Sequence, residues 1–370
     1  MDNIPATIGA RPTRPSRQRS TFIRHPRITA IGTALPPHLM TQAEVKDEVR
    51  RQFTRIPDLE RLLPLFDRSG VHTRYFAFPK DYYLDGKSFG RRNDDYVAVA
   101  ETLGEQAIRS ALAQASLEPK DVDVFLFTTT TGLATPSLDA LLAHRLGMRH
   151  GVRRMPFFGL GCAGGAALLG MAADHLRTRP AGVAVVLSVE LCSLTLLLDD
   201  ASKTNLIGMA LFGDGAAAAV LTGHDHVVPG PAVSASETVY FENSKELMGW
   251  RFSEAGFELV LSPTVPAFIL EALPTEVHTF LGKHGLRKED IRHFALHPGG
   301  KQVLEAYRRG LGLTDTELAP TREALSRYGN LSSASVLFSL DELLKKTKTN
   351  PGERGFMTAL GPGFAAEMLL

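Results

Sequence analysis

The chain has 370 residues, of which 44% are hydrophobic and 22% are charged, and its formal net charge is +1. This length fits about two domain-sized units with a sizeable core, and the balanced charge gives no general case for binding nucleic acid. Its two cysteines, Cys162 and Cys192, are too few for a disulfide framework or a four-cysteine metal site.

The first segment, residues 1–27, is rich in arginine, proline, serine and threonine. This composition predicts a disordered, solvated arm, and a tail that contacts an acidic partner or a neighbouring subunit is the alternative. The arm lacks an apolar signal core, and no later apolar run reaches the roughly 18–20 residues of a membrane span. We therefore expect a protein of the reducing cytoplasm without stable membrane insertion.

The remaining chain presents the same landmarks twice, which predicts an N-terminal half, 28–225, and a C-terminal half, 226–370. In each half a helical pattern precedes a strand-like run, LEPKDVDVFLF at 117–127 and LRKEDIRHFAL at 286–296. About forty residues later come Cys162 and Asn330, each expected to follow a strand and to start a helix of small residues. The last landmark is a strand that opens with GDGAAAAVL at 213–221 or GPGFAAEML at 361–369.

Strands that alternate with helices predict α/β units with mostly parallel, buried sheets. Two such units in tandem predict a duplicated fold with approximate twofold symmetry. Because Cys162 and Asn330 hold matching places, their two helix starts are expected to converge on one pocket.

Cys162 is the candidate nucleophile. It lies in GLGCAGG, whose glycines permit a tight turn and close approach of a ligand. A helix N-terminus stabilises an anion, so we expect a lowered pKa for this thiol and faster alkylation than at Cys192. A buried structural cysteine is the alternative.

His297 and Asn330 are the candidate partners of Cys162. His297 ends a predicted strand, before Pro-Gly-Gly, whereas His293 within the same strand is the competing histidine. Asn330 lies in YGNLSSASV, where asparagine more often caps a helix, but its amide could also donate to a thioester oxygen.

Taken in order, GLGCAGG, LFGDGAAA, HPGG, YGNLSSASVLF and the terminal GPG resemble the chalcone-synthase-like type III polyketide synthases. The resemblance runs over residues 28–370 and implies the thiolase fold, with duplicated five-stranded sheets in a layered αβαβα arrangement. It also implies a homodimer that uses acyl-CoA and malonyl-CoA and needs no cofactor or metal. Cys162 would carry the acyl group, while His297 and Asn330 would hold the thioester carbonyl and the enolate formed when malonyl-CoA loses carbon dioxide.

The resemblance also suggests pocket residues. Phe212 matches a gatekeeper phenylalanine, and Leu259 stands where a second one is expected, with Phe257 as its possible substitute. Arg61 and Arg68 fall where the family places basic residues that bind coenzyme A phosphates, and Lys301 is a further candidate. The other aligned pocket positions are Thr130, Thr135, Cys192, Thr195, Gly249 and Ser332.

The favoured hypothesis is a long-chain fatty acyl-CoA starter that gives an alkylpyrone or alkylresorcinol, because 194–198 is apolar and the pocket positions are small. One alternative is synthesis of tetrahydroxynaphthalene from malonyl-CoA alone. Another is an initiating ketoacyl-ACP synthase, although such enzymes carry His-Gln-Ala-Asn where this chain has His-Pro-Gly-Gly. A non-enzymatic scaffold is the last alternative.

Overall fold

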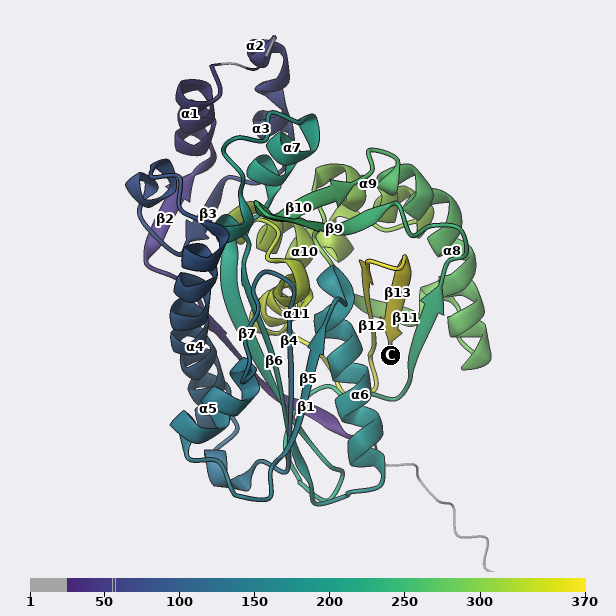
Figure 1. The fold of residues 1–370 in the computed structure, drawn as a ribbon. Helices are drawn as coiled ribbons and strands as arrows, with labels where there is room; N and C mark the ends of the chain where they lie inside the picture. Colours follow the sequence, from purple (N-terminus) through teal and green to yellow (C-terminus); the bar gives the residue numbers. More distant parts are fainter. Residues whose placement is uncertain (1–24, 55, 57) are drawn as a thin grey trace, which may run out of the picture.

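The computed structural model describes residues 25–370 apart from 55 and 57 (Figure 1). Most of the predicted N-terminal arm therefore lies outside the described residues. Its end, however, belongs to the folded protein, because Arg27 opens the first strand and donates to the Gly230 carbonyl at 2.7 Å.

The first sheet has five strands. Its central strands, with sequences VFLFTT and VAVVLSVEL, are buried along their whole length, as expected for strands covered on both faces. In spatial order the strands are β1 (Arg27–Ala34), β7 (Asp214–Thr222), β6 (Val183–Leu191), β4 (Val124–Thr129) and β5 (Arg153–Phe158).

The second sheet repeats four of these five positions. The pairings β1–β7, β7–β6 and β6–β4 are antiparallel, antiparallel and parallel, and the second sheet has the same sequence of pairings. This match confirms the duplication predicted from the landmarks. In corresponding order its strands are β8 (Ser236–Tyr240), β13 (Ala365–Leu369), β12 (Arg354–Gly361) and β11 (Ile291–Leu296).

Two details of the predicted sheets need correction. The second sheet has four strands, and in each sheet antiparallel pairings are at least as frequent as parallel ones. The reason lies in the connections. The chain leaves β6 at Leu191 and re-enters the sheet at Asp214, its direct partner, so β7 must run back along β6.

Helices and sheets alternate in five layers, which confirms the αβαβα arrangement (Figure 1). Alternate residues of β4 show this, because Val124 and Leu126 face the middle helices whereas Phe125 and Phe127 face the outer ones. The outer helices of the first half are α4 (Phe89–Gln114) and α5 (Leu138–Leu146); the middle layer is α6 (Gly164–Arg177) and α11 (Ser335–Lys346); the far layer is α8 (Val265–Lys283), α9 (Lys301–Gly310) and part of α10 (Asp315–Tyr328).

The two middle helices approach each other closely near their starts. Gly165 lies against the carbonyl oxygen of Ser333, and a Cβ there would overlap that oxygen. Small residues are therefore required where the two halves meet.

A smaller apolar cluster lies beside the first half and covers one end of its sheet. None of the helices described here is long and apolar enough to cross a membrane. The elements of this region are α1 (Gln42–Gln52), α2 (Leu59–Leu62), α3 (Pro64–Arg68), α7 (Lys203–Leu211) and the antiparallel pair of β2 (His38–Thr41) with β3 (Thr73–Phe76), whose connection contains α1, α2 and α3. A hairpin, β9 (Met248–Ser253) with β10 (Gly256–Leu261), extends from the C-terminal half.

Candidate active site

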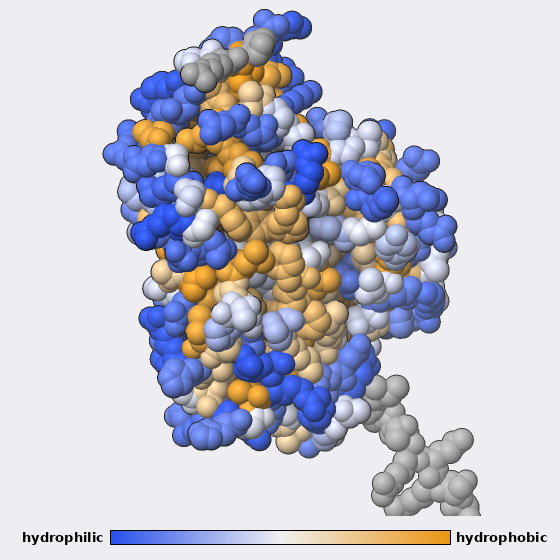
Figure 2. Space-filling view, in the orientation of Figure 1, coloured by the Kyte–Doolittle hydropathy of each residue, from blue (hydrophilic) through white to orange (hydrophobic). Residues whose placement is uncertain are grey.

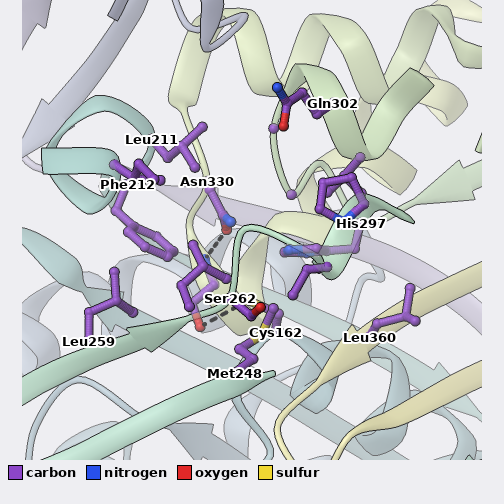
Figure 3. Close-up of a pocket in the computed structure, with 18 of the residues that line it drawn as sticks. Cys162, Leu211, Phe212, Met248, Leu259, Ser262, His297, Gln302, Asn330 and Leu360 are labelled. Carbon is purple, nitrogen blue, oxygen red and sulfur yellow. Dashed lines mark hydrogen bonds between the residues drawn. The ribbon is translucent and has the colours of Figure 1, made fainter. Parts of the chain in front are cut away.

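A cavity of about 440 Å³ lies where the two halves meet, and Cys162, His297 and Asn330 all line it (Figure 3). The sulfur comes from the start of α6, the imidazole from the end of β11, and the carboxamide from the loop before α11. The predicted convergence of three distant side chains on one cavity is therefore found.

A glycine-rich turn places Cys162 in the cavity. Between the end of β5 and the cysteine, Gly159 and Gly161 have φ angles of 93° and 50°, which a residue with a side chain rarely adopts. A Cβ on Gly161 would also overlap Pro362. The Cys162 side chain is buried, and its Sγ lies 3.8 Å from the Ser332 hydroxyl oxygen.

The expectation that the pKa of the Cys162 thiol is lowered is wrong. Burial raises the pKa of Cys162 to about 12, although hydrogen bonding with Ser332 and Asn330 acts in the opposite direction. The pKa of Cys192 also lies well above its usual range, again chiefly through burial. Desolvation thus outweighs the favourable position at a helix start, and Cys162 stands as a neutral thiol.

His297 is held by its backbone, and its ring is left free. Its amide donates to the Thr358 carbonyl at 3.0 Å, yet neither ring nitrogen has a partner among the described residues. Burial lowers the pKa of this imidazole to about 3, so the ring is neutral and able to accept a proton. The competing His293 instead bonds Glu353 at 2.8 Å, outside the cavity.

Asn330 directs its amide nitrogen toward the reacting sulfur. Its Oδ1 accepts from the Ser332 amide at 2.8 Å and from the Ser335 hydroxyl at 3.3 Å, which leaves Nδ2 as the free donor. The prediction that a strand precedes Asn330 is wrong, because α10 ends at Tyr328 and Gly329 makes the turn with φ of 72°. The residue nevertheless bridges to Phe212 in a parallel β-bridge.

A buried carboxylate that sequence reasoning missed organises the hydroxyls beside the sulfur. Glu190 accepts from the Thr130 amide and hydroxyl at 3.1 and 3.2 Å, from the Thr131 hydroxyl at 2.7 Å, and from Ser333. Burial raises its pKa, and these bonds counter that effect. Its signal in the sequence is one glutamate inside the apolar run VAVVLSVEL.

A buried guanidinium, also missed, holds the segment that carries Phe212. Arg74 on β3 donates to the carbonyls of Met209 at 2.6 Å, Phe212 at 3.0 Å and Ala210 at 3.1 Å, and to Gln42. It is fully buried. Arg74 therefore fixes the end of α7 and, with it, the position of the predicted gatekeeper.

Six of the nine predicted pocket residues line the cavity. Leu259 fits beside Phe212 because Gly208 has no side chain; a Cβ there would lie 2.9 Å from Leu259 Cδ2. A Cβ on Gly249, by contrast, would meet no atom within 4 Å; Gly249 pairs with Val260 on the hairpin face that carries the exposed Arg251–Glu258 ion pair, so it borders the cavity with its backbone while its neighbours Met248 and Trp250 face inward. The six are Thr130, Cys192, Phe212, Gly249, Leu259 and Ser332.

Three predicted pocket residues lie elsewhere. Thr135 is exposed on the surface. Thr195 is buried, but its hydroxyl donates to the Cys192 carbonyl at 2.8 Å. Phe257 packs edge-to-face on Phe89, Trp250 and Phe252, so it does not replace the missing second gatekeeper.

Positive charges gather at the mouth of the cavity. Of the predicted cations, Arg68 and Lys301 line it, and the Lys301 amide donates to the Ser69 carbonyl, which brings α9 next to the end of α3. Lys203, at the start of α7, joins them and was missed. Arg61 does not line the cavity; its side chain is 83% exposed and faces Asp58. No cluster of acidic, histidine or cysteine side chains within the described part of the chain could hold a metal ion.

Comparisons with known proteins agree with this geometry. The models of the N-terminal and C-terminal domains of chalcone and stilbene synthases match residues 16–226 and 232–370. A 1,3,6,8-tetrahydroxynaphthalene synthase of Streptomyces peucetius is 41% identical, over 99% of this chain and 96% of that protein. A 3,5-dihydroxyphenylacetyl-CoA synthase of Streptomyces toyocaensis is 33% identical, over 93% and 89%. The crystal structure of the tetrahydroxynaphthalene synthase from Streptomyces coelicolor, a bacterial type III polyketide synthase, aligns with a TM-score of 0.89 at 30% identity, over 93% of this chain and 98% of that one.

Proposed function

This chain belongs to the chalcone and stilbene synthase family of type III polyketide synthases, and we propose that it extends an apolar acyl-CoA starter with malonyl-CoA. Enzymes of this family are acyltransferases that condense coenzyme A thioesters with loss of carbon dioxide and require no further cofactor. The expected product is an alkylpyrone or alkylresorcinol.

In the loading step, the Cys162 sulfur attacks the thioester carbonyl while the neutral imidazole of His297 takes the thiol proton. Each charge that forms stabilises the other, so the pair needs no thiolate beforehand. Asn330 Nδ2 donates to the carbonyl oxygen as negative charge develops there. The bond from the acyl carbon to the coenzyme A sulfur then breaks, and His297 returns the proton to the departing thiolate.

In the extension step, the carbon–carboxylate bond of malonyl-CoA breaks and leaves its electron pair as an enolate. The enolate oxygen accepts hydrogen bonds from His297 and Asn330, which line the same cavity as Cys162 and have side-chain nitrogens free to donate. The enolate carbon attacks the acyl carbon, and the Cys162 thiolate leaves. The chain, longer by two carbons and attached to coenzyme A, can then be loaded again.

The apolar lining of the cavity is the observation that favours an apolar starter, since these side chains can contact a hydrocarbon chain but offer it no hydrogen bonds. Mass spectrometry of products from palmitoyl-CoA and malonyl-CoA, with Cys162→Ala as the inactive control, should reveal alkylated pyrones or resorcinols. Products built from malonyl-CoA alone would refute the proposal. The apolar wall comprises Ile207, Leu211, Met248, Leu259 and Leu261.

A second candidate is synthesis of 1,3,6,8-tetrahydroxynaphthalene from malonyl-CoA alone. It is favoured by the two Streptomyces synthases of that name, at 41% and 31% identity. Incubation with malonyl-CoA as the sole substrate separates the candidates, because only this one predicts the naphthalene. The match to both chalcone synthase domains weighs against an initiating ketoacyl-ACP synthase or a scaffold.

The cations at the mouth are suited to coenzyme A. Arg68, Lys203 and Lys301 have no acidic partner within the described part of the chain and can face the phosphates of a thioester whose acyl end reaches Cys162. Such substrates are consistent with a cytoplasmic enzyme.

A homodimer is supported by the exposed edge of the first sheet. β5 pairs with β4 on one side only, and its Phe158, 47% exposed, packs against the exposed Phe252. Figure 2 shows a hydrophobic band across the middle of this face. Such a surface fits a second copy of the chain. Analytical ultracentrifugation of the wild type and of Phe158→Glu tests this; a monomeric wild type would refute it.

A further inference from the structure

Tyr307 on α9 has a polar group that the proposed chemistry does not yet use. The residue lines the cavity and is 1% exposed, and its hydroxyl has no hydrogen-bond partner among the described residues. In the sequence it reads as an ordinary core position, one turn after Val303. A buried hydroxyl without a protein partner is unfavourable, so it is suited to donate a hydrogen bond to a bound ligand.

No described residue accepts a hydrogen bond from the Tyr307 hydroxyl. The cavity wall on this side is apolar and is formed by α8, α9 and the β12–β13 turn, with Ile269, Val303, Leu360 and Phe364 among its residues. Leu360 and His297 mark this side in Figure 3. The hydroxyl therefore differs from that of Tyr96, which is equally buried but donates to Thr129 at 2.7 Å.

Tyr307 also lies within electrostatic reach of the reacting sulfur. Burial, followed by negative charge on Cys162, raises the pKa of this phenol above its usual range. The group consequently stays protonated and acts as a hydrogen-bond donor. Decarboxylative extension creates hydrogen-bond acceptors within reach of Cys162. These are the carbonyl oxygens of the growing chain, which occur on every second carbon.

We propose that Tyr307 donates a hydrogen bond to a ketone oxygen of the extended chain and thereby selects oxygenated intermediates for the α8–α9 side of the cavity. The apolar starter would then occupy the opposite side, beside Leu259 and Leu261. This inference rests on the proposed extension by malonyl-CoA and assigns a specificity-determining residue to it.

The test compares two ligands that differ by one carbonyl group, acetoacetyl-CoA and butyryl-CoA. Binding is measured by calorimetry in the Cys162→Ala protein, which neither thioester can acylate. We expect acetoacetyl-CoA to bind roughly five- to tenfold more tightly, as one neutral hydrogen bond allows. Adding Tyr307→Phe should bring the ratio of the two dissociation constants close to one, with butyryl-CoA binding nearly unchanged. Tyr82→Phe is the control, because that phenol donates to Asp95 at 2.6 Å outside the cavity and should leave the ratio intact.

Two outcomes would overturn the inference. The first is a ratio that Tyr307→Phe does not change. The second is an equal loss of affinity for both ligands, together with a lower melting temperature, which would mean that the ring only supports the wall. The long-chain starter is tested separately by its products, so its failure would not affect this comparison of four-carbon thioesters.

Discussion

The neutral imidazole of His297 makes a definite prediction about acid stability. The ring is buried without a partner, and burial lowers its pKa from 6.5 to about 3. Between these two pH values the unfolded chain binds a proton that the folded chain does not, so the folded state loses stability as the pH falls. At about 1.4 kcal/mol for each pH unit, His297 should cost the folded state about 3 kcal/mol at pH 4 relative to pH 7.

The perturbation is His297→Gln, which replaces the imidazole with a side chain that does not titrate. Urea unfolding at pH 7 and pH 4 gives the free energy of unfolding of each protein. Carboxylates and the other histidines titrate alike in both proteins, so their effects cancel in the comparison. The wild type should lose about 3 kcal/mol more than the variant between the two pH values. His278→Gln, at an exposed site, is the matched control and should behave as the wild type.

The reasoning is refuted if the wild type and His297→Gln lose the same free energy between pH 7 and pH 4. That result would mean that the ring is solvated or paired in the folded protein.

Three further predictions concern the cavity, its mouth and its support. Leu261→Trp enlarges a side chain of the apolar cavity wall, so kcat/KM for palmitoyl-CoA should fall roughly tenfold or more, at about 0.8 kcal/mol for each methylene displaced, while acetyl-CoA is used as before; equal losses for both would contradict it. Lys203→Ala with Lys301→Ala should raise KM for malonyl-CoA about three- to tenfold at low salt, whereas the exposed Arg61→Ala should not. Arg74→Met leaves the buried carbonyls of Met209 and Phe212 without their donor, while Ala210 keeps Gln42, and should lower the free energy of unfolding by about 2–5 kcal/mol, measured with urea; a loss under about 1 kcal/mol would show that these carbonyls find other partners.

The sequence predicted the layers and the reacting side chains because both depend on local patterns. Apolar runs such as VFLFTT can only be covered strands, and the glycines around Cys162 can only serve a tight turn. The similar spacing of Cys162 and Asn330 from the matched runs at 117–127 and 286–296 then placed both at one junction.

The remaining features depend on segments that are distant in sequence. The direction of a strand depends on the end of the sheet at which the connection enters it. The composition of β7 does not indicate that this strand runs antiparallel to β6. Lys203 and Arg68 line the same cavity only after folding. Similarly, the sequence does not show that Glu190 accepts hydrogen bonds from Thr130 and Thr131, because these residues lie in the loop after another strand, β4. The direction of the pKa shift of Cys162 was predicted wrongly, because the sequence motif indicates a helix start but does not show how deeply the sulfur is buried.

The contact between Gly165 and Ser333 has a consequence for turnover. The sulfur begins one helix and the carboxamide precedes the other, so their separation is set by how deeply these two helices interlock. A single methyl group at position 165, outside the cavity, would wedge the helices apart and move nucleophile and donor out of alignment. Because misplacement by about 1 Å can slow a reaction roughly a hundredfold, the precision of this chemistry is maintained at a backbone contact that no substrate touches.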